Sequence, residues 1–256
     1  MASLAQAWLG RLPAEGRLDL TVSLDRFPEL RDAISPPTFS VAVRDGMVTG
    51  EGDYIEAAID AYLVPEGAEP PRDGSEDAIS CGDIDLDLDL ETRELRLSTL
   101  DVPPEAQAAG LGSLVMAQLA ELGEDLGLWS ICLEAGNVGR WAWMRCGFDF
   151  DDPAGRDAVV GAATDFAQAL GRDVDPSEIE HAWDFVELPG TVSAEEIQAA
   201  GGVAIRSAGR PISLGKALVL GPPSAANPWW GRLRLDPGDT GRIRLKEYVA
   251  SYGSSS

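Results

Sequence analysis

Apolar and polar side chains alternate most strictly over residues 84–90, where isoleucine or leucine takes every second position and aspartate the positions between. A period of two is typical of a β-strand with one buried and one exposed face. Residues 91–93 can turn the chain into a second such segment at 94–102, so we predict an antiparallel strand pair. The aspartates are interpreted as a solvated row with Arg96 as a cross-strand partner. Cation binding is the alternative, although the row lacks the loop glycine of an EF-hand.

Shorter β-like stretches separated by turn signals precede this pair. Residues 18–24 alternate, residues 39–43 are rich in strand-forming side chains, and residues 54–64 fit either a strand or a helix. Asp45-Gly46 and residues 51–53 are typical of turns. The pattern therefore predicts mostly strands before residue 92.

A helical period begins at Leu111. Apolar residues recur on one helical face up to Leu126, and Gly127 supplies a stop signal. A buried strand is predicted next, at 128–133. A strand, a helix and a strand of these lengths predict a parallel strand pair joined by a right-handed crossover.

The pattern becomes mainly helical after residue 150. We predict helices at 154–171, 176–188 and 193–200. A β-hairpin is predicted at 232–245, around a Pro-Gly turn. Four arginines of this hairpin would lie on one face, where we expect them to pair with acidic side chains of the same chain: Arg232, Arg234, Arg242 and Arg244.

Composition and charge narrow the function classes. Of the 256 residues, 45% are hydrophobic, and 43 acidic against 20 basic residues give a net charge of −23. We therefore expect a globular protein whose negative field disfavours nucleic acid and anionic membranes and favours a cationic partner. Solubility in a salt-rich cytosol is the alternative explanation of the acidity. The chain shows no basic leader and no apolar run of about 18 residues, so we expect a cytoplasmic protein.

Cysteine and histidine are too few for several kinds of site. Cys81, Cys132 and Cys146 are odd in number and far apart, which fits neither a disulfide framework nor a zinc knuckle. His181 has no second histidine or nearby cysteine with which to share a metal. We expect no metal site, and no Ser-His-Asp hydrolase because the sequence has no G-x-S-x-G elbow.

Gly110 and Gly112 open the predicted helix and carry the strongest chemical signal in the sequence. The first N–H groups of a helix have no intrahelical acceptor and carry a partial positive charge, so they can hold an anion. Glycines let a phosphate approach those N–H groups closely. The alternative is that both glycines only permit a tight corner. A Walker A loop is excluded because no lysine lies here, and Val115 breaks the dinucleotide-binding pattern.

Two motifs in this part of the chain resemble the GCN5-related N-acetyltransferase (GNAT) family. Residues 107–112, Gln-Ala-Ala-Gly-Leu-Gly, are similar to the family's Arg/Gln-x-x-Gly-x-Gly/Ala pyrophosphate loop. Residues 137–148 resemble its asparagine, short helix and terminal Gly-Phe. The resemblance covers residues 95–150. It implies an α/β fold with a mixed, mostly antiparallel sheet and one splayed pair of parallel strands.

The domain organisation follows from the same resemblance. Residues 1–150 would be a GNAT-like acyl-CoA-binding domain with atypical strands at 1–92. Residues 151–256 would be a helical C-terminal extension that includes the hairpin at 232–245 and ends in a disordered tail.

The resemblance also implies a site for acetyl-CoA or another acyl-CoA as cosubstrate. The backbone at the end of a strand would pair with the pantetheine arm at Leu100, Asp101 and Val102. Main-chain amides would hold the pyrophosphate at Gln107, Ala108, Ala109, Gly110, Leu111, Gly112 and Ser113. Asn137 would hydrogen-bond the cofactor. The alternatives are a core position for Val102, a helix cap for Ser113 and a turn for Asn137.

The implied function is N-acyl transfer, most simply of acetyl, from acyl-CoA to a small-molecule or peptide amine. In many family members a tyrosine four residues before the final glycine is the general acid. Trp143 stands there, and an indole N–H is a very poor proton donor. The base is unassigned, and the acidic residues near the expected cleft are Asp101, Glu105 and Glu134.

A second interpretation is a catalytically degenerate GNAT-like module that binds or assembles with a protein partner or with copies of itself. Trp143 favours it. So does the opening of the chain, because the first ninety residues are not predicted to contain the family's usual strand, two helices and strand.

Overall fold

The computed structural model describes residues 4–36, 38–51, 54–69, 82–102, 110–136, 139–205, 207, 209–223 and 228–253. The chain divides into two compact units: unit 1 is Met1–Cys132 with Arg234–Ser256, and unit 2 is Leu133–Leu233. Strand β6 (Ser130–Ala135) leads from unit 1 into unit 2, and β10 (Trp229–Arg234) leads back. The domain boundary after residue 150 stays a prediction.

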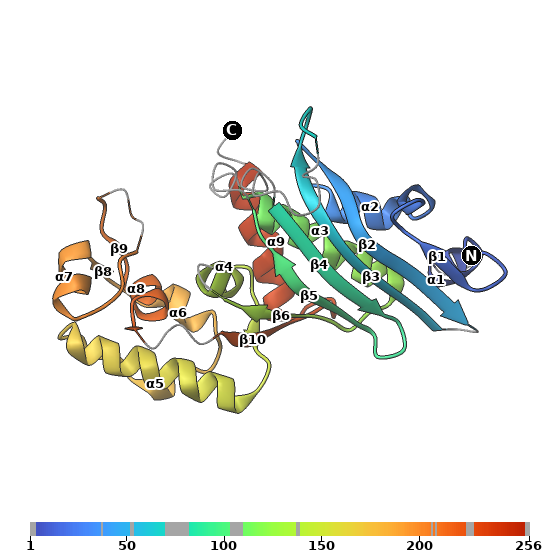
Figure 1. Ribbon diagram of the computed structural model, residues 1–256. Helices are drawn as coiled ribbons and strands as arrows, with labels where there is room; N and C mark the ends of the chain where they lie inside the picture. Colours follow the sequence, from blue (N-terminus) through green and yellow to red (C-terminus); the bar gives the residue numbers. More distant parts are fainter. Residues whose placement is uncertain are drawn as a thin grey trace. The chain divides into compact units, whose positions relative to one another are not determined.

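Unit 1 is built on a sheet in which consecutive strands pair antiparallel (Figure 1). The first five strands are β1 (Arg17–Asp19), β2 (Phe39–Glu51), β3 (Tyr54–Pro65), β4 (Gly82–Asp89) and β5 (Glu94–Leu100). In β4 the apolar residues Ile84, Leu86 and Leu88 are fully buried, and the aspartates between them face the other side. Asp87 lies opposite Arg96. The predicted antiparallel pair and its cross-strand partner are confirmed.

Strand β5 is followed by helix α3 (Leu111–Leu126) and then by β6, which lies next to β5 in the sheet. The N–H of Trp129, just before β6, donates to the carbonyl of Arg93, just before β5, at 2.8 Å. The two strands therefore run in the same direction and are the parallel pair of the sheet. Gly127 ends α3 in the left-handed conformation, with φ 77°. The predicted helix, its stop signal and the parallel pair are confirmed.

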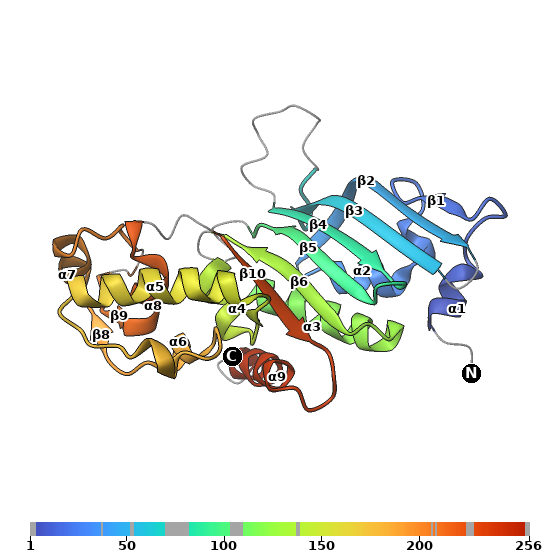
Figure 2. The same ribbon diagram turned by 90° about the horizontal axis from the view of Figure 1, so that it is seen from below.

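The helices of unit 1 lie on one face of this sheet (Figures 1 and 2). Helix α3 contacts α1 (Leu4–Leu9), α2 (Pro28–Ile34) and α9 (Thr240–Gly253). Trp8 and Phe27 are completely buried under this layer, with their rings edge to face at 5.0 Å. Burial of such large apolar side chains is the main force that holds the helices on the sheet.

Three helical segments lie in the part of the chain for which the pattern predicts mostly strands, and none of them was predicted: α1, the 3-10 turn η1 (Leu24–Arg26) and α2. Pro28 occupies the first turn of α2, where its missing N–H is not needed. Leu30, Ala33 and Ile34 are buried at helical spacing. A helix of two turns offers too few apolar positions to outweigh the strand-like alternation before it.

The predicted turn at Asp45-Gly46 is also wrong, because both residues lie inside β2. The β2–β3 register shifts between Val43 and Asp45, which marks a β-bulge. Glycine suits position 46 because a Cβ there would lie 3.2 Å from the Cβ of Leu20. Sequence signals for a turn and for a bulge are the same.

Residues 232–245 do not form the predicted hairpin. Strand β10 ends at Arg234, and helix α9 begins at Thr240. Arg242 and Leu245 are both buried, at the spacing of one helical face. The alternation of arginine with apolar residues over four positions is too short to distinguish a strand from a helix.

Two of the four arginines assigned to that hairpin do pair with acidic side chains, as predicted. Within unit 2, Nε of Arg232 donates to Asp151 at 2.5 Å. Within unit 1, Nε of Arg242 donates to Glu124.

Unit 2 carries the remaining helices. They are α4 (Gly139–Arg145), α5 (Pro153–Ala169), the 3-10 turn η4 (Pro176–Glu178), α6 (Asp184–Glu187), α7 (Ala194–Ala199) and α8 (Leu214–Leu220). Strand β7 (Asp149–Phe150) pairs antiparallel with β10, which lies next to β6. Strands β8 (Thr191–Val192) and β9 (Ile212–Ser213) form a separate pair.

The helix predictions for this unit have a mixed outcome. The predictions at 154–171 and 193–200 are confirmed by α5 and α7. The prediction at 176–188 is wrong, because a loop separates η4 from α6. The carboxylate of Asp184 accepts the N–H groups of Glu180 and His181, which holds that loop out of the helical conformation.

Candidate functional site

The start of helix α3 is shaped by a glycine in the left-handed conformation. Gly110 caps the helix with φ 73° and ψ 15°, and its carbonyl accepts the N–H groups of Ser113 and Leu114, each at 3.1 Å. Residues other than glycine adopt such a conformation at a cost. The N–H groups of Leu111 and Gly112 come before the first hydrogen bond within the helix, which the N–H of Ser113 donates to Gly110. The local structure therefore has the form of an anion-binding helix start.

The end of strand β5 lies against this helix start. A Cβ added to Gly112 would lie 3.8 Å from Cγ2 of Val102 and 4.0 Å from Cδ2 of Leu100. These are ordinary van der Waals separations, so the site tolerates a small side chain there. The structure thus brings together Leu100, Val102 and Gly112, which the resemblance assigned to two different parts of one cofactor.

Strand β5 is bent shortly before it reaches the site. The β4–β5 register shifts between Asp85 and Leu86, so that Ser98 is an extra residue in β5. Beyond the strand, the N–H of Asp101 still donates to the carbonyl of Asp83 on β4, at 2.8 Å. Asp101 is exposed. Its carboxylate is therefore open to solvent at the end of the parallel strand pair.

The other assigned residues fall into three groups. Leu111 is buried, and Leu100, Val102, Gly112 and Ser113 are half-buried. Glu134 is exposed on β6, in the part of that strand that belongs to unit 2. The remaining residues lie outside the described part of the chain: Glu105, Gln107, Ala108, Ala109 and Asn137.

The second motif occupies α4 and the residues after it in unit 2. Trp143 packs against Phe148 with ring centroids 5.8 Å apart, and Phe148 is fully buried. A Cβ added to Gly139 would lie 2.9 Å from Nε1 of Trp143, so the glycine makes room for the indole. Gly147 has a φ of 87°, which a turn at this position requires. Trp143 is thus a packed residue with one N–H donor and no acceptor.

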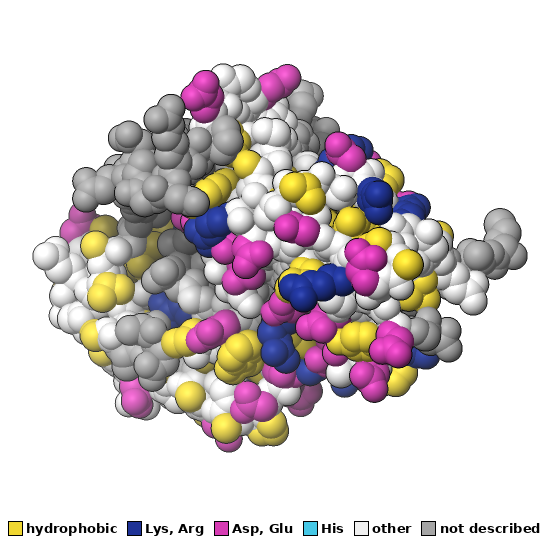
Figure 3. Space-filling model, turned by 45° about the vertical axis from the view of Figure 1, so that its right-hand side comes forward, with side chains coloured by type: hydrophobic (Ala, Val, Ile, Leu, Met, Phe, Trp, Pro, Cys, Tyr) yellow, Lys and Arg dark blue, Asp and Glu magenta, His cyan; other side chains and the backbone are white. Residues whose placement is uncertain are grey.

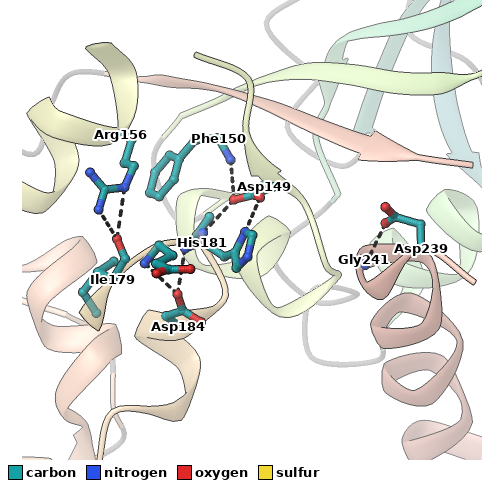
Figure 4. Close-up of polar contacts among 10 residues, drawn as sticks. Asp149, Phe150, Arg156, Ile179, His181, Asp184, Asp239 and Gly241 are labelled. Atoms are coloured by element: carbon teal, nitrogen blue, oxygen red, sulfur yellow. Dashed lines mark hydrogen bonds and ion pairs between the residues drawn. The ribbon is translucent and has the colours of Figure 1, made fainter. Parts of the chain in front are cut away.

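Asp149 and His181 form a polar cluster that sequence reasoning missed (Figure 4). One carboxylate oxygen of Asp149 accepts the N–H groups of Phe150 and Ala182, and the other lies 2.6 Å from Nδ1 of His181. The imidazole stacks on Trp183 at 4.6 Å. No local pattern could have found the pair, because the residues are 32 positions apart.

Two aspartates of β4, Asp83 and Asp85, are electrostatically unfavourable in the folded protein. Burial raises the pKa of Asp83, and the nearby Asp101 and Asp60 raise it further against the opposing effect of Arg44. Burial also raises the pKa of Asp85. Oδ1 of Asp83 is buried without a hydrogen-bond partner among the described residues. The charged form of Asp83 is therefore disfavoured in the folded protein.

Asp83→Asn is expected to stabilise the protein at pH 7. Because the folded-state pKa of Asp83 is raised, the variant gains stability above that pKa, and the gain disappears as the pH falls through it towards the unfolded value near 3.9. We expect about 0.5 kcal/mol, since solvent screens this partly exposed group. Urea unfolding between pH 4 and pH 8 measures the difference. Asp87→Asn is the control, because Asp87 is exposed opposite Arg96; an equal gain there would contradict the explanation by burial.

Some kinds of site are not found in the described part of the chain. No group of three or more His, Cys, Asp or Glu side chains there could hold a metal ion. Among the same residues, no helix has both the length and the apolar character needed to cross a membrane. Cys132 and Cys146 are buried cysteines that form no disulfide bond. Cys81 lies outside the described residues.

The candidate site is thus the junction of β5 and α3 in unit 1, with Gly110 and Gly112 at its helix start. A function can be inferred only from the residues of this site. No protein-family model matches this chain, and no curated protein or solved structure matches it either.

Proposed function

We propose that this protein is an acyl-CoA-dependent N-acyltransferase of a GNAT-like type, with acetyl-CoA as the simplest donor. The observation that carries the proposal is the junction of β5 and α3. There a glycine-capped helix start lies within van der Waals reach of Leu100 and Val102, at the end of one of two parallel strands. A phosphate group on the helix start and an extended arm along β5 would occupy one continuous site.

The order of elements before the site also supports the proposal. Strand β1, the turn η1, helix α2 and strand β2 follow one another in the chain. The family usually opens with a strand, two helices and a strand. The 3-10 turn η1 and helix α2 stand where the family has two helices, so the order of elements resembles that opening in part.

The residues at the junction suit acyl transfer from a thioester to an amine. N–H groups at the start of α3 would bind the pyrophosphate. A main-chain N–H group at the end of β5 would polarise the thioester carbonyl. The neutral amine attacks that carbonyl, a C–N bond forms, the C–S bond breaks, and the thiolate departs. Among the described residues of unit 1, the exposed carboxylate of Asp101 is the candidate to receive the proton of the amine.

The acceptor is proposed to be a cationic amine. The chain carries a net charge of −23. Such a field attracts a protonated polyamine or a basic peptide and raises its local concentration. It repels anionic acceptors.

Calorimetric titration with acetyl-CoA tests the proposal. The native chain should bind, and Gly112→Ala should bind within about threefold, because a Cβ fits beside Val102 and Leu100. Gly112→Gln and Gly112→Glu have the same size and differ by one charge. Glutamate near a helix start stabilises the helix, so the fold is kept, but its carboxylate opposes the pyrophosphate. We expect Gly112→Glu to bind at least tenfold more weakly than Gly112→Gln. No binding by the native chain would sink the proposal.

A module that binds acyl-CoA without turnover is the second candidate, and Trp143 favours it. Its indole is packed against Phe148 and cannot act as the acid that a tyrosine would supply. Release of free thiol from acetyl-CoA in the presence of a panel of amines separates the two. Binding without thiol release would favour the module.

A further inference from the structure

Strand β2 has an edge that is only half covered. On one side it pairs with β3 along its whole length, from Phe39 opposite Pro65 to Glu51 opposite Tyr54. On the other side β1 covers only Met47–Thr49, and the N–H of Leu20 donates to the carbonyl of Gly46 as the last bond. The chain then turns away into η1. Within the described part of the chain, residues 39–43 therefore have a sheet neighbour on one side only.

The direction of the backbone groups on this edge follows from the printed bonds. The carbonyl of Thr38 accepts the N–H of Glu66 on the β3 side, at 2.9 Å. Because successive residues of a strand point their N–H and C=O groups to opposite sides, Ser40 and Ala42 also face β3. The N–H and C=O groups of Val41 and Val43 face away from β3. They are the groups that a further strand would use.

The open edge lies in a groove of about 650 Å³. The groove is lined by the edge itself and by the chain between β1 and η1, with α2 at its end: Leu20–Asp25, Arg31, Asp32, Ser35 and Phe39–Val43. Val22 lines the groove and is 78% exposed, more than any other large apolar side chain among the described residues. The side chain of Val22 and the outward-facing main-chain groups of Val41 and Val43 are therefore accessible to a ligand in the same groove.

The negative charge near the groove favours a basic segment as its occupant. Arg31 bonds to both Asp25 and Asp32, with N–O distances of 2.9 Å, which leaves one net negative charge among the three. Acidic side chains are interspersed with basic ones over the face in Figure 3. A second copy of this chain also has a net charge of −23, so the long-range field opposes its approach. A basic segment would be attracted.

We propose that the edge of β2 at residues 39–43 is a docking site for an extended basic peptide segment, which adds to the sheet as a further strand. The segment exchanges hydrogen bonds with Val41 and Val43, and every second side chain packs on Val22 and its neighbours. The β-bulge between Val43 and Asp45 ends the paired stretch, so the footprint is about five residues. The proposal does not depend on acyl transfer.

A variant that removes one hydrogen bond without changing the fold tests the proposal. Val41→Pro deletes an N–H that faces away from β3 and has no strand partner among the described residues, and proline is tolerated on an edge strand when its N–H side faces solvent. Val41→Thr keeps the N–H and the β-branched shape. The probe is a capped eight-residue peptide of alternating valine and lysine, labelled for fluorescence anisotropy. A peptide of alternating valine and glutamate is its control.

The native chain and Val41→Thr should bind the basic peptide within about threefold of each other. Val41→Pro should bind at least tenfold more weakly with an unchanged circular dichroism spectrum. N-methylation of alternate residues of the peptide should weaken binding equally, which keeps the test valid if Val41→Pro misfolds. Equal binding by both peptides, or by native and Val41→Pro, would overturn the proposal. A native dimer that Val41→Pro dissociates in light scattering would also overturn it, because the occupant would then be a second copy.

Discussion

Gly215→Ala is expected to destabilise unit 2 by about 3 kcal/mol, at the upper end of the usual cost of overpacking. A Cβ at position 215 would lie 1.7 Å from the carbonyl oxygen of Phe185 and 2.7 Å from its carbonyl carbon. Both are backbone atoms, so no side-chain rotation relieves the clash. Helices α6 and α8 would have to separate, and Phe185 and Leu218, which are 1% exposed, would become less buried. Urea unfolding followed by tryptophan fluorescence measures the loss.

The same substitution in α5 is the matched control. Gly161 is a helical glycine with no atom within 4 Å of an added Cβ. Alanine has the higher helix propensity, so Gly161→Ala should stabilise unit 2 by about 0.5–1 kcal/mol. The two variants therefore change stability in opposite directions. If Gly215→Ala and the native protein had the same midpoint of urea unfolding, the close approach of α6 and α8 would be wrong.

Elements whose pattern repeats several times within one segment could be predicted from the sequence. Strand β4 shows its period over seven residues, and helix α3 keeps one apolar face from Leu111 to Leu126. In both cases local propensity and burial point to the same structure. The glycines at 110 and 112 were found for the same reason, because a helix start is a local feature.

Shorter elements could not be predicted, because their conformation depends on tertiary contacts. Helix α9 has an alternating start that reads as a strand, and it is helical because Arg242 and Leu245 are buried on one side. Helix α2 buries Leu30 and Ile34 in two turns. For such segments the partner surface decides the structure, and the sequence does not display it.

The candidate site divides in the same way. The helix start was predicted from Gly110 and Gly112, but its closeness to Val102 came only from the family resemblance. The pairing of Asp149 with His181 was not predicted, because the two residues are far apart in the chain and the segment between β7 and η4 brings them together. Sequence therefore indicated the chemistry of the helix start but not the set of neighbours around it.

Glu124→Gln is expected to destabilise unit 1 by about 3 kcal/mol, because it removes the counter-charge of a buried guanidinium. Arg242 is 2% exposed on α9, and its Nε donates to Glu124 on α3. Nη2 of Arg242 is already buried without a hydrogen-bond partner among the described residues. Glutamine keeps the size of the side chain and loses the charge. The midpoint of urea unfolding should fall accordingly.

Removing the guanidinium of Arg242 as well should restore part of the stability that Glu124→Gln loses. In the double variant Glu124→Gln with Arg242→Met, no unpaired charge remains buried, and methionine fills the space between α3 and α9. Glu121→Gln is the control, because Glu121 lies exposed on the same helix, and its effect should stay within about 0.5 kcal/mol. The order of stability is therefore native, then the double variant, then Glu124→Gln alone. If Glu124→Gln and Glu121→Gln unfolded at the same midpoint, the ion pair would contribute nothing to the docking of α9. The C-terminal helix would then be held on α3 by apolar contacts such as that of Leu245, which is fully buried.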